Sequence, residues 1–154
     1  MFRTLLALLT IHTVACGTDN NQGEPGVFPA DYAQTYQQVR GCRFSIEHNL
    51  VHIRVLASPD ALVPYMGRTR PFPTGSIVLK EQYGEDDTTC AGPIETFTVM
   101  QKLDVGSAPE TLDWTWQEVN RAIEVLPTSV KRCVDCHTDC GTAPEGYDGT
   151  CTLP

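Results

Sequence analysis

The feature that most constrains this chain is a Cys-x-x-Cys-His motif near the C-terminus, formed by Cys133, Cys136 and His137. Two thiols three positions apart on a helical turn can each add to one vinyl group of the same haem. The adjacent histidine then lies beneath the iron as an axial ligand. The motif therefore predicts a covalently bound c-type haem whose iron is ligated by His137.

The same cysteines have other interpretations. A Cys-x-x-Cys pair also occurs in thioredoxin-like redox sites, zinc half-sites and disulfide frameworks, and Cys140 extends the run to a pattern typical of a zinc knuckle. Structural zinc sites usually separate their ligand pairs by a longer loop, whereas His137 directly follows Cys136. Haem attachment is therefore favoured, and a haem-free lipoprotein stabilised by disulfides or zinc is the alternative.

Residues 1–16 have the organisation of an export signal, because Arg3 precedes a short apolar run and small residues precede Cys16. The apolar run is too short for a membrane-spanning helix. The segment resembles a bacterial lipoprotein signal, in which the cysteine is lipidated, and ordinary signal-peptide cleavage nearby is the alternative. Both processes lead to a compartment that permits haem attachment and disulfides. We therefore expect a periplasmic protein anchored to the membrane through Cys16.

The rest of the chain divides into a tether and one domain. Residues 17–26 contain three glycines and no apolar residue, which predicts a flexible tether, and residues 27–154 are enough for a single haem domain. Removing residues 1–15 takes away one positive charge, Arg3, so the net charge moves from −8 to −9. An acidic protein repels nucleic acid and anionic lipid, so we expect a small neutral substrate or a basic redox partner, with membrane contact through the lipid alone.

The remaining cysteines indicate disulfides. If Cys16 carries lipid and the motif cysteines carry haem, four cysteines remain in an oxidising compartment, and they can form two disulfides in three pairings. Pairing of Cys42 with Cys90 and of Cys140 with Cys151 is favoured, because the second bond closes a short Gly/Pro-rich tail and the first ties two interior loops.

Hydrophobic periodicity predicts an α+β fold, a single domain rich in antiparallel β-sheet with short helices and a C-terminal helix that carries the haem motif. Strands that follow one another closely in sequence usually pair antiparallel. The predicted helices are 29–41, 58–67 and a segment that begins at 127–128, and the predicted strands are 46–57, 77–83 and 94–103. Residues 112–126 fit either a helical stripe or a strand, and a strand through the tryptophans is favoured.

The position of the motif bears on the sixth ligand of the iron. Common electron carriers place the motif early and supply a methionine much later, but the segment after His137 contains no methionine, and Met66 and Met100 lie upstream. An open sixth position is therefore predicted, which favours ligand binding or catalysis over pure electron transfer.

Four segments, taken together, resemble the cytochrome P-460 family. They occur in the family's order over roughly residues 28–137 and are 72–81 (FPTGSIVLKE), 98–102 (TVMQK), Asp113-Trp114 and the Cys-x-x-Cys-His motif. The resemblance implies a β-rich domain, usually dimeric, that holds a c-type haem with an open distal side.

The resemblance also implies a role for Lys80, which occupies the position of a lysine bonded to a meso carbon of the porphyrin. The implied activity is oxidation of hydroxylamine to nitrous oxide or nitric oxide, with electrons passed to an acceptor such as a small soluble cytochrome. The related cytochromes c′-beta share the fold without the lysine bond, and they bind nitric oxide or carbon monoxide without catalysis. That function is the alternative for this chain.

Proton transfer from hydroxylamine needs an acceptor within hydrogen-bond reach. Glu118 and Glu124, which precede the motif helix, are the carboxylate candidates, although each is equally suited to the surface. Arg54 and His52 share the polar face of the predicted strand 46–57 and are candidates for the distal pocket. The sequence identifies no partner for His48.

Three other large side chains have structural interpretations. Lys102 does not match the linking position and is assigned a structural role, and Lys131 is assigned to the surface. Trp114 and Trp116 are assigned to the core or to a dimer interface, because large aromatic side chains usually supply buried contact area.

Overall fold

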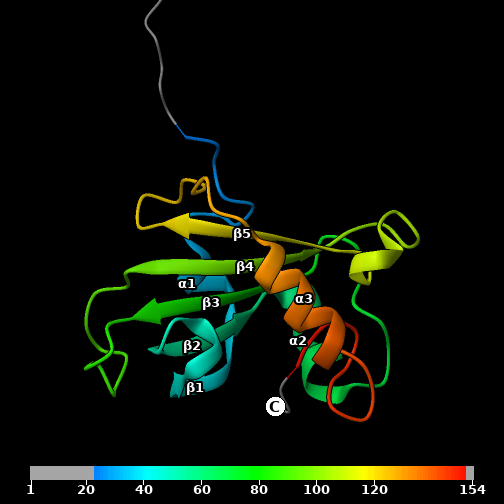
Figure 1. Ribbon diagram of the computed structural model, residues 1–154, viewed down its shortest axis with the longest axis horizontal. Coiled ribbons are helices and arrows are strands. Elements are labelled where there is room, and N and C mark those ends of the chain that lie inside the picture. The colour runs from blue at the N-terminus through cyan, green and yellow to red at the C-terminus, as the bar shows by residue number, and fades with distance from the viewer. Residues whose placement is uncertain (1–22, 152–154) are drawn as a thin grey trace, which may run out of the picture.

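The computed structural model describes residues 23–151. The predicted export signal, the lipidation site Cys16 and most of the tether lie outside the described residues. The described chain is one domain built on an antiparallel sheet with strand order β1-β2-β3-β4-β5 (Figure 1). The strands are β1 (Gln37–Ser45), β2 (Val51–Ala57), β3 (Ile77–Tyr83), β4 (Thr96–Lys102) and β5 (Trp114–Asn120).

The helices are short and lie on both sides of this sheet (Figure 1). Within residues 23–151, no helix is long and apolar enough to cross a membrane. The α-helices are α1 (Tyr32–Thr35), α2 (Pro59–Gly67) and α3 (Lys131–Cys140), and the 3-10 helices are η1 (Ile46–His48) and η2 (Pro109–Thr111).

Both faces of the sheet are buried, because side chains alternate between the two faces along each strand. One face packs against α2 and α3 through a cluster that includes Ile53, Val78 and Trp114. The other face packs against Tyr32 of α1 through a cluster that includes Leu79 and other strand residues. Burial on two sides explains why the central strand β3 is apolar at consecutive positions, Ile77–Leu79, before the polar Lys80–Gln82.

The predicted α+β class and the antiparallel sheet are confirmed, but the N-terminal helix is much shorter than expected. It ends at Thr35 because Tyr36 adopts an extended conformation, and the following residues pair with β2 as strand β1. Tyr32 and Val39 are both buried, as helical spacing suggested, but they belong to different elements. Strand pairing satisfies the backbone of residues 37–45 and overrides the local helical pattern.

Two further boundaries differ from the prediction. Residues 46–50 belong to the turn between β1 and β2 and not to a strand, since η1 is followed by Asn49 and Leu50 with φ angles of 65° and 60°. The motif helix begins at Lys131, after residues 127–129 that are not helical. The strand through both tryptophans is confirmed as β5.

Both disulfides have the favoured pairing. Cys42–Cys90 connects β1 to the loop after β3, and Cys140–Cys151 closes the loop after α3.

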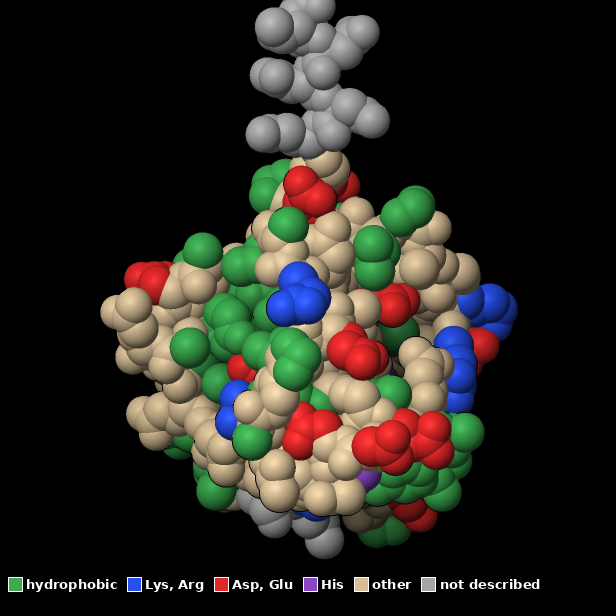
Figure 2. Space-filling view, turned by 90° about the vertical axis from the view of Figure 1, so that its left-hand side faces the viewer, with side chains coloured by type: hydrophobic (Ala, Val, Ile, Leu, Met, Phe, Trp, Pro, Cys, Tyr) green, Lys and Arg blue, Asp and Glu red, His purple; other side chains and the backbone are tan. Residues whose placement is uncertain are grey.

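Acidic and basic side chains are interspersed on the face shown in Figure 2, and no extended basic patch is visible on that face.

The packing of β3 leads to a stability prediction. Leu79 is fully buried, so Leu79→Ala leaves a cavity and should lower the free energy of unfolding by about 2–5 kcal/mol. Val105 is 89% exposed, so the control Val105→Ala should stay within about 0.5 kcal/mol of the parent. Urea unfolding followed by circular dichroism measures both, and equal values for the two variants would contradict the assigned core.

Candidate haem site

A cavity of about 310 Å³ lies between α3 and the sheet face that packs against it. Alternate residues of the strands point into it, since every second side chain of a strand faces the same side. The first turn after β1 and the loop after α3 complete the wall. The lining includes Arg43, Ser45, His48, Val55, Val78, Lys80, Gln82, Thr98, Met100, Trp116, Glu118, Cys133, Cys136 and His137.

Helix α3 presents all three residues of the Cys-x-x-Cys-His motif to this cavity. Cys133 and Cys136 are the free thiols among the described cysteines, because the other four described cysteines are paired. Burial raises the pKa of Cys133, which favours the protonated thiol. The helical spacing therefore places two available thiols at the wall of one cavity.

His137 is only 8% exposed, and its orientation is fixed by the backbone. Its Nδ1 lies 2.6 Å from the carbonyl oxygen of Gly149. A carbonyl oxygen can only accept, so Nδ1 carries the proton and the Nε2 lone pair is directed into the cavity. Burial and the charge of Lys80 lower the pKa of His137 to about 3, so the ring is neutral at physiological pH, as a metal ligand must be.

Lys80 extends from the central strand into the same cavity. Its Nζ lies 3.2 Å from Nε2 of His137 and 2.8 Å from Nε2 of His48. Burial lowers the pKa of Lys80 to about 8, so a large share of the side chain is neutral amine under mildly alkaline conditions. A neutral amine is a nucleophile, whereas an ammonium is not.

His48 is the partner of Lys80 that the sequence did not identify. Its Nδ1 lies 2.7 Å from Ser45 Oγ, which orients the ring so that Nε2 faces the cavity. Burial and the charge of Lys80 lower the pKa of His48 to about 3. The side chain therefore offers a neutral imidazole nitrogen to the cavity, next to Lys80.

Several polar atoms of the cavity wall lack a protein partner. Buried atoms without a hydrogen bond among the described residues include Arg43 Nη1, Gln82 Nε2, Thr98 Oγ1 and Trp116 Nε1. Leaving such groups unsatisfied costs about 1–3 kcal/mol each, so the wall is suited to a bound group that supplies partners. A guanidinium matches a carboxylate, and a haem carries two propionates. Two thiols, one oriented imidazole and these orphaned polar atoms together fit a haem.

The family model named Cytochrome P460 matches residues 29–143. This chain belongs to the cytochrome P460 family. Membership implies a haem cofactor, in agreement with the fit of the cavity. No curated protein matches the chain. The matched region includes all five strands, Lys80 and the haem motif, and it ends before Gly149, whose carbonyl oxygen contacts His137.

The structure separates the four candidates for substrate contact. Glu118 lines the cavity from β5. Glu124 does not line it and instead accepts a hydrogen bond from the Asn120 side chain at 3.0 Å. Arg54 and His52 also lie outside the cavity wall, so their expected place in the distal pocket is wrong.

The error for Arg54 and His52 follows from strand alternation. Ile53 and Val55 face the α3 side, so the intervening residues point to the opposite face. There Arg54 Nε donates to the buried Glu81 carboxylate at 2.5 Å. The cavity lies against the apolar face of β2, whereas the sequence pattern predicted a pocket on the polar face.

The two tryptophans are buried, and the two other predicted lysines differ in their exposure. Trp116 lines the cavity, with its ring 5.9 Å from that of His137, and Trp114 is buried in the same cluster. Lys102 is buried and ion-paired, which agrees with a structural role. Lys131 is exposed and pairs with Asp135 one helical turn away.

The zinc-knuckle alternative is wrong in this fold, because the sulfur of Cys140 is bonded to Cys151 and is not available as a ligand. Within residues 23–151, no cluster of three or more His, Cys, Asp or Glu side chains could hold a metal ion.

The arrangement of the free thiols leads to a prediction. Replacing both Cys133 and Cys136 with alanine should abolish haem that survives denaturing electrophoresis, because no thiol remains to form a thioether in the cavity. Haem staining of the gel measures this. The control replaces Cys42 and Cys90, a disulfide outside the cavity wall, and should retain stained haem. Covalent haem in the Cys133/Cys136 variant would contradict the assignment.

Proposed function

We propose that this cytochrome P460 is an exported c-type haem protein that oxidises hydroxylamine and passes the electrons to an external acceptor, such as a small soluble cytochrome. The observation that carries the proposal is the position of Lys80, whose Nζ lies inside the cavity and 3.2 Å from Nε2 of His137. In this family, hydroxylamine oxidation is associated with a lysine bonded to the porphyrin.

The chain supplies three attachment groups and one ligand for the cofactor. Cys133 and Cys136 would hold haem through thioethers, His137 would ligate the iron through Nε2, and Lys80 would bond to the macrocycle. When bound, the haem supplies an iron centre that can take electrons from a nitrogen substrate. The lowered pKa of Lys80 supports its part, since formation of a carbon–nitrogen bond needs the neutral amine.

Oxidation of hydroxylamine also releases protons, and we assign their first acceptor to His48. Its Nε2 lies 2.8 Å from Lys80 Nζ and its Nδ1 is held by Ser45, so an unprotonated nitrogen faces the substrate space. The charge of Lys80 is the second cause of the low pKa of His48, after burial. Loss of the positive charge of Lys80 would therefore make His48 a stronger base. Glu118 on β5 is the second candidate.

Three further features belong to the same proposal. Two disulfides and a c-type attachment motif support export, because both need an oxidising compartment. We retain the lipid anchor at Cys16 and a homodimer as proposals, and the substrate is a small neutral molecule that an acidic protein does not repel.

Replacing Lys80 tests the activity. Lys80→Leu should keep covalent haem but abolish hydroxylamine-dependent reduction of an acceptor dye, and it should remove a red shift of the ferrous Soret band that the wild type shows. Lys131→Leu is the matched control, because Lys131 lies on the motif helix but is exposed and outside the cavity. Normal turnover of hydroxylamine by Lys80→Leu would contradict the proposal.

The wild-type spectrum distinguishes the alternative function. An ordinary c-type ferrous spectrum that shifts on addition of nitric oxide or carbon monoxide, together with no hydroxylamine turnover, would assign this chain to gas binding of the cytochrome c′-beta kind.

Replacing His48 tests the proton acceptor. His48→Gln keeps a polar side chain but cannot accept a proton, so kcat for hydroxylamine should fall by roughly 100-fold or more. Glu124→Gln removes a carboxylate that does not line the cavity, and it should leave kcat unchanged. Steady-state kinetics with an acceptor dye measure both. Equal kcat values in His48→Gln and wild type would exclude His48 as the acceptor.

A further inference from the structure

The loop that follows α3 folds back beneath the axial histidine. The disulfide Cys140–Cys151 closes this loop, and the carbonyl oxygen of Gly149 lies 2.6 Å from Nδ1 of His137. This contact holds His137 on the side away from the cavity. Whatever fixes the Gly149 carbonyl therefore fixes the imidazole ring.

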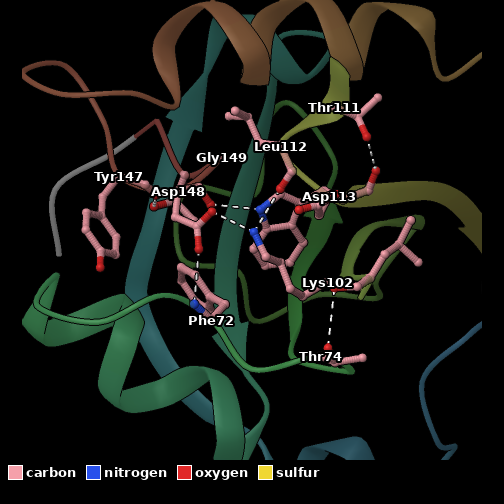
Figure 3. Close-up of polar contacts among 12 residues, drawn as sticks. Phe72, Thr74, Lys102, Thr111, Leu112, Asp113, Tyr147, Asp148 and Gly149 are labelled. Carbon is pink, nitrogen blue, oxygen red and sulfur yellow. Dashed lines mark hydrogen bonds and ion pairs between the residues drawn. The ribbon is translucent and has the colours of Figure 1, made fainter. Parts of the chain in front are cut away.

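Asp148, the residue before Gly149, is held by three separate parts of the fold (Figure 3). Its Oδ1 lies 2.6 Å from Lys102 Nζ at the end of β4, and its Oδ2 accepts from the backbone N–H of Phe72 at 3.0 Å. Its carbonyl oxygen accepts from Trp114 Nε1 of β5 at 2.8 Å. These bonds join the loop to the sheet at a point next to Gly149.

Lys102 is also held by more than one contact. It is 5% exposed, and its Nζ also donates to the carbonyl oxygen of Leu112 at 2.8 Å. A buried ammonium needs such partners, because desolvation of an unpaired charge is costly. The ion pair with Asp148 therefore holds one geometry and does not sample the many arrangements of a surface pair.

The backbone at Gly149 leaves little freedom. Its φ is 83°, and a Cβ added there would lie 2.6 Å from Trp114 Nε1, so the position requires glycine. Its N–H donates to the carbonyl oxygen of Gly141 at 2.9 Å. The peptide is thus fixed on one side by the indole ring and on the other by the start of the loop.

We propose that Lys102 and Asp148 are positioning residues that hold the Gly149 carbonyl against His137 and so set the orientation and the electron-donating strength of the axial ligand. A hydrogen bond from the non-ligating nitrogen to a carbonyl increases the basicity of the ligating nitrogen. A more basic ligand stabilises the oxidised iron relative to the reduced iron. The inference rests on ligation of haem by His137, which is part of the proposed function, but it does not depend on hydroxylamine as substrate.

Asp148→Asn in the haem-loaded protein tests the inference. The variant removes the charge that Lys102 holds, so the Gly149 carbonyl should move away from His137. We expect the reduction potential to shift upward and the iron–histidine stretching frequency of the ferrous protein, measured by resonance Raman scattering, to shift downward. The double variant Cys140→Ser/Cys151→Ser opens the same loop without changing Asp148, and it should shift both readouts in the same directions.

Arg54→Gln is the matched control, because it also removes one partner of an ion pair with a buried side chain, Glu81, but on the opposite face of the sheet. It should lower the thermal midpoint, as Asp148→Asn does, and leave the potential and the stretching frequency unchanged. If neither Asp148→Asn nor the double cysteine variant shifts these two readouts, the loop is only structural and the inference is overturned. Failure of the wild type to bind haem, or to oxidise hydroxylamine, would instead count against the proposed function.

Discussion

The pairing of β3 with strands on both sides is the constraint on which the rest of the structure depends. Its register with β2 and β4 sets which of its residues face α3 and which face α1. Because successive side chains alternate, Lys80 enters the cavity while its neighbour Glu81 enters the opposite core. A shift of one residue would exchange the two groups and leave the cavity without its lysine. The chemistry of the site is therefore tied to backbone hydrogen bonding.

Lys80 has a different electrostatic setting from the other buried charges. Glu81 accepts bonds from Arg54, Tyr32 and Tyr83, and it raises the pKa of both tyrosines together with burial. Lys102 likewise meets a carboxylate. Lys80 instead meets imidazole nitrogens, which provide hydrogen bonds but no compensating negative charge. A buried ionisable group that has hydrogen-bond partners but no opposite charge nearby has a perturbed pKa. Such groups are concentrated at functional sites.

The features that could be predicted from the sequence are those that short segments of the chain encode. The haem motif, the inward-facing lysine, the strand through the tryptophans and the disulfide pairing were accessible, because each rests on short spacing, on cysteine arithmetic or on a family resemblance. Arg54 was assigned to the wrong face, since a strand buried on both sides gives no polar face to follow. The roles of His48 and Gly149 could not be predicted, because their partners are fixed by tertiary folding: His48 meets Lys80 across the sheet, and Gly149 has no distinctive side chain.

The loop after α3 supplies a contact of the site from outside the residues that the family model matches. The family match ends at residue 143, whereas the carbonyl that contacts His137 belongs to residue 149. The five strands, Lys80 and the haem motif thus lie within the matched residues, whereas the backbone partner of His137 lies outside them. A substitution in the segment between Cys140 and Gly149 can therefore alter the contact to Nδ1 of His137 while every strand that lines the cavity keeps its sequence.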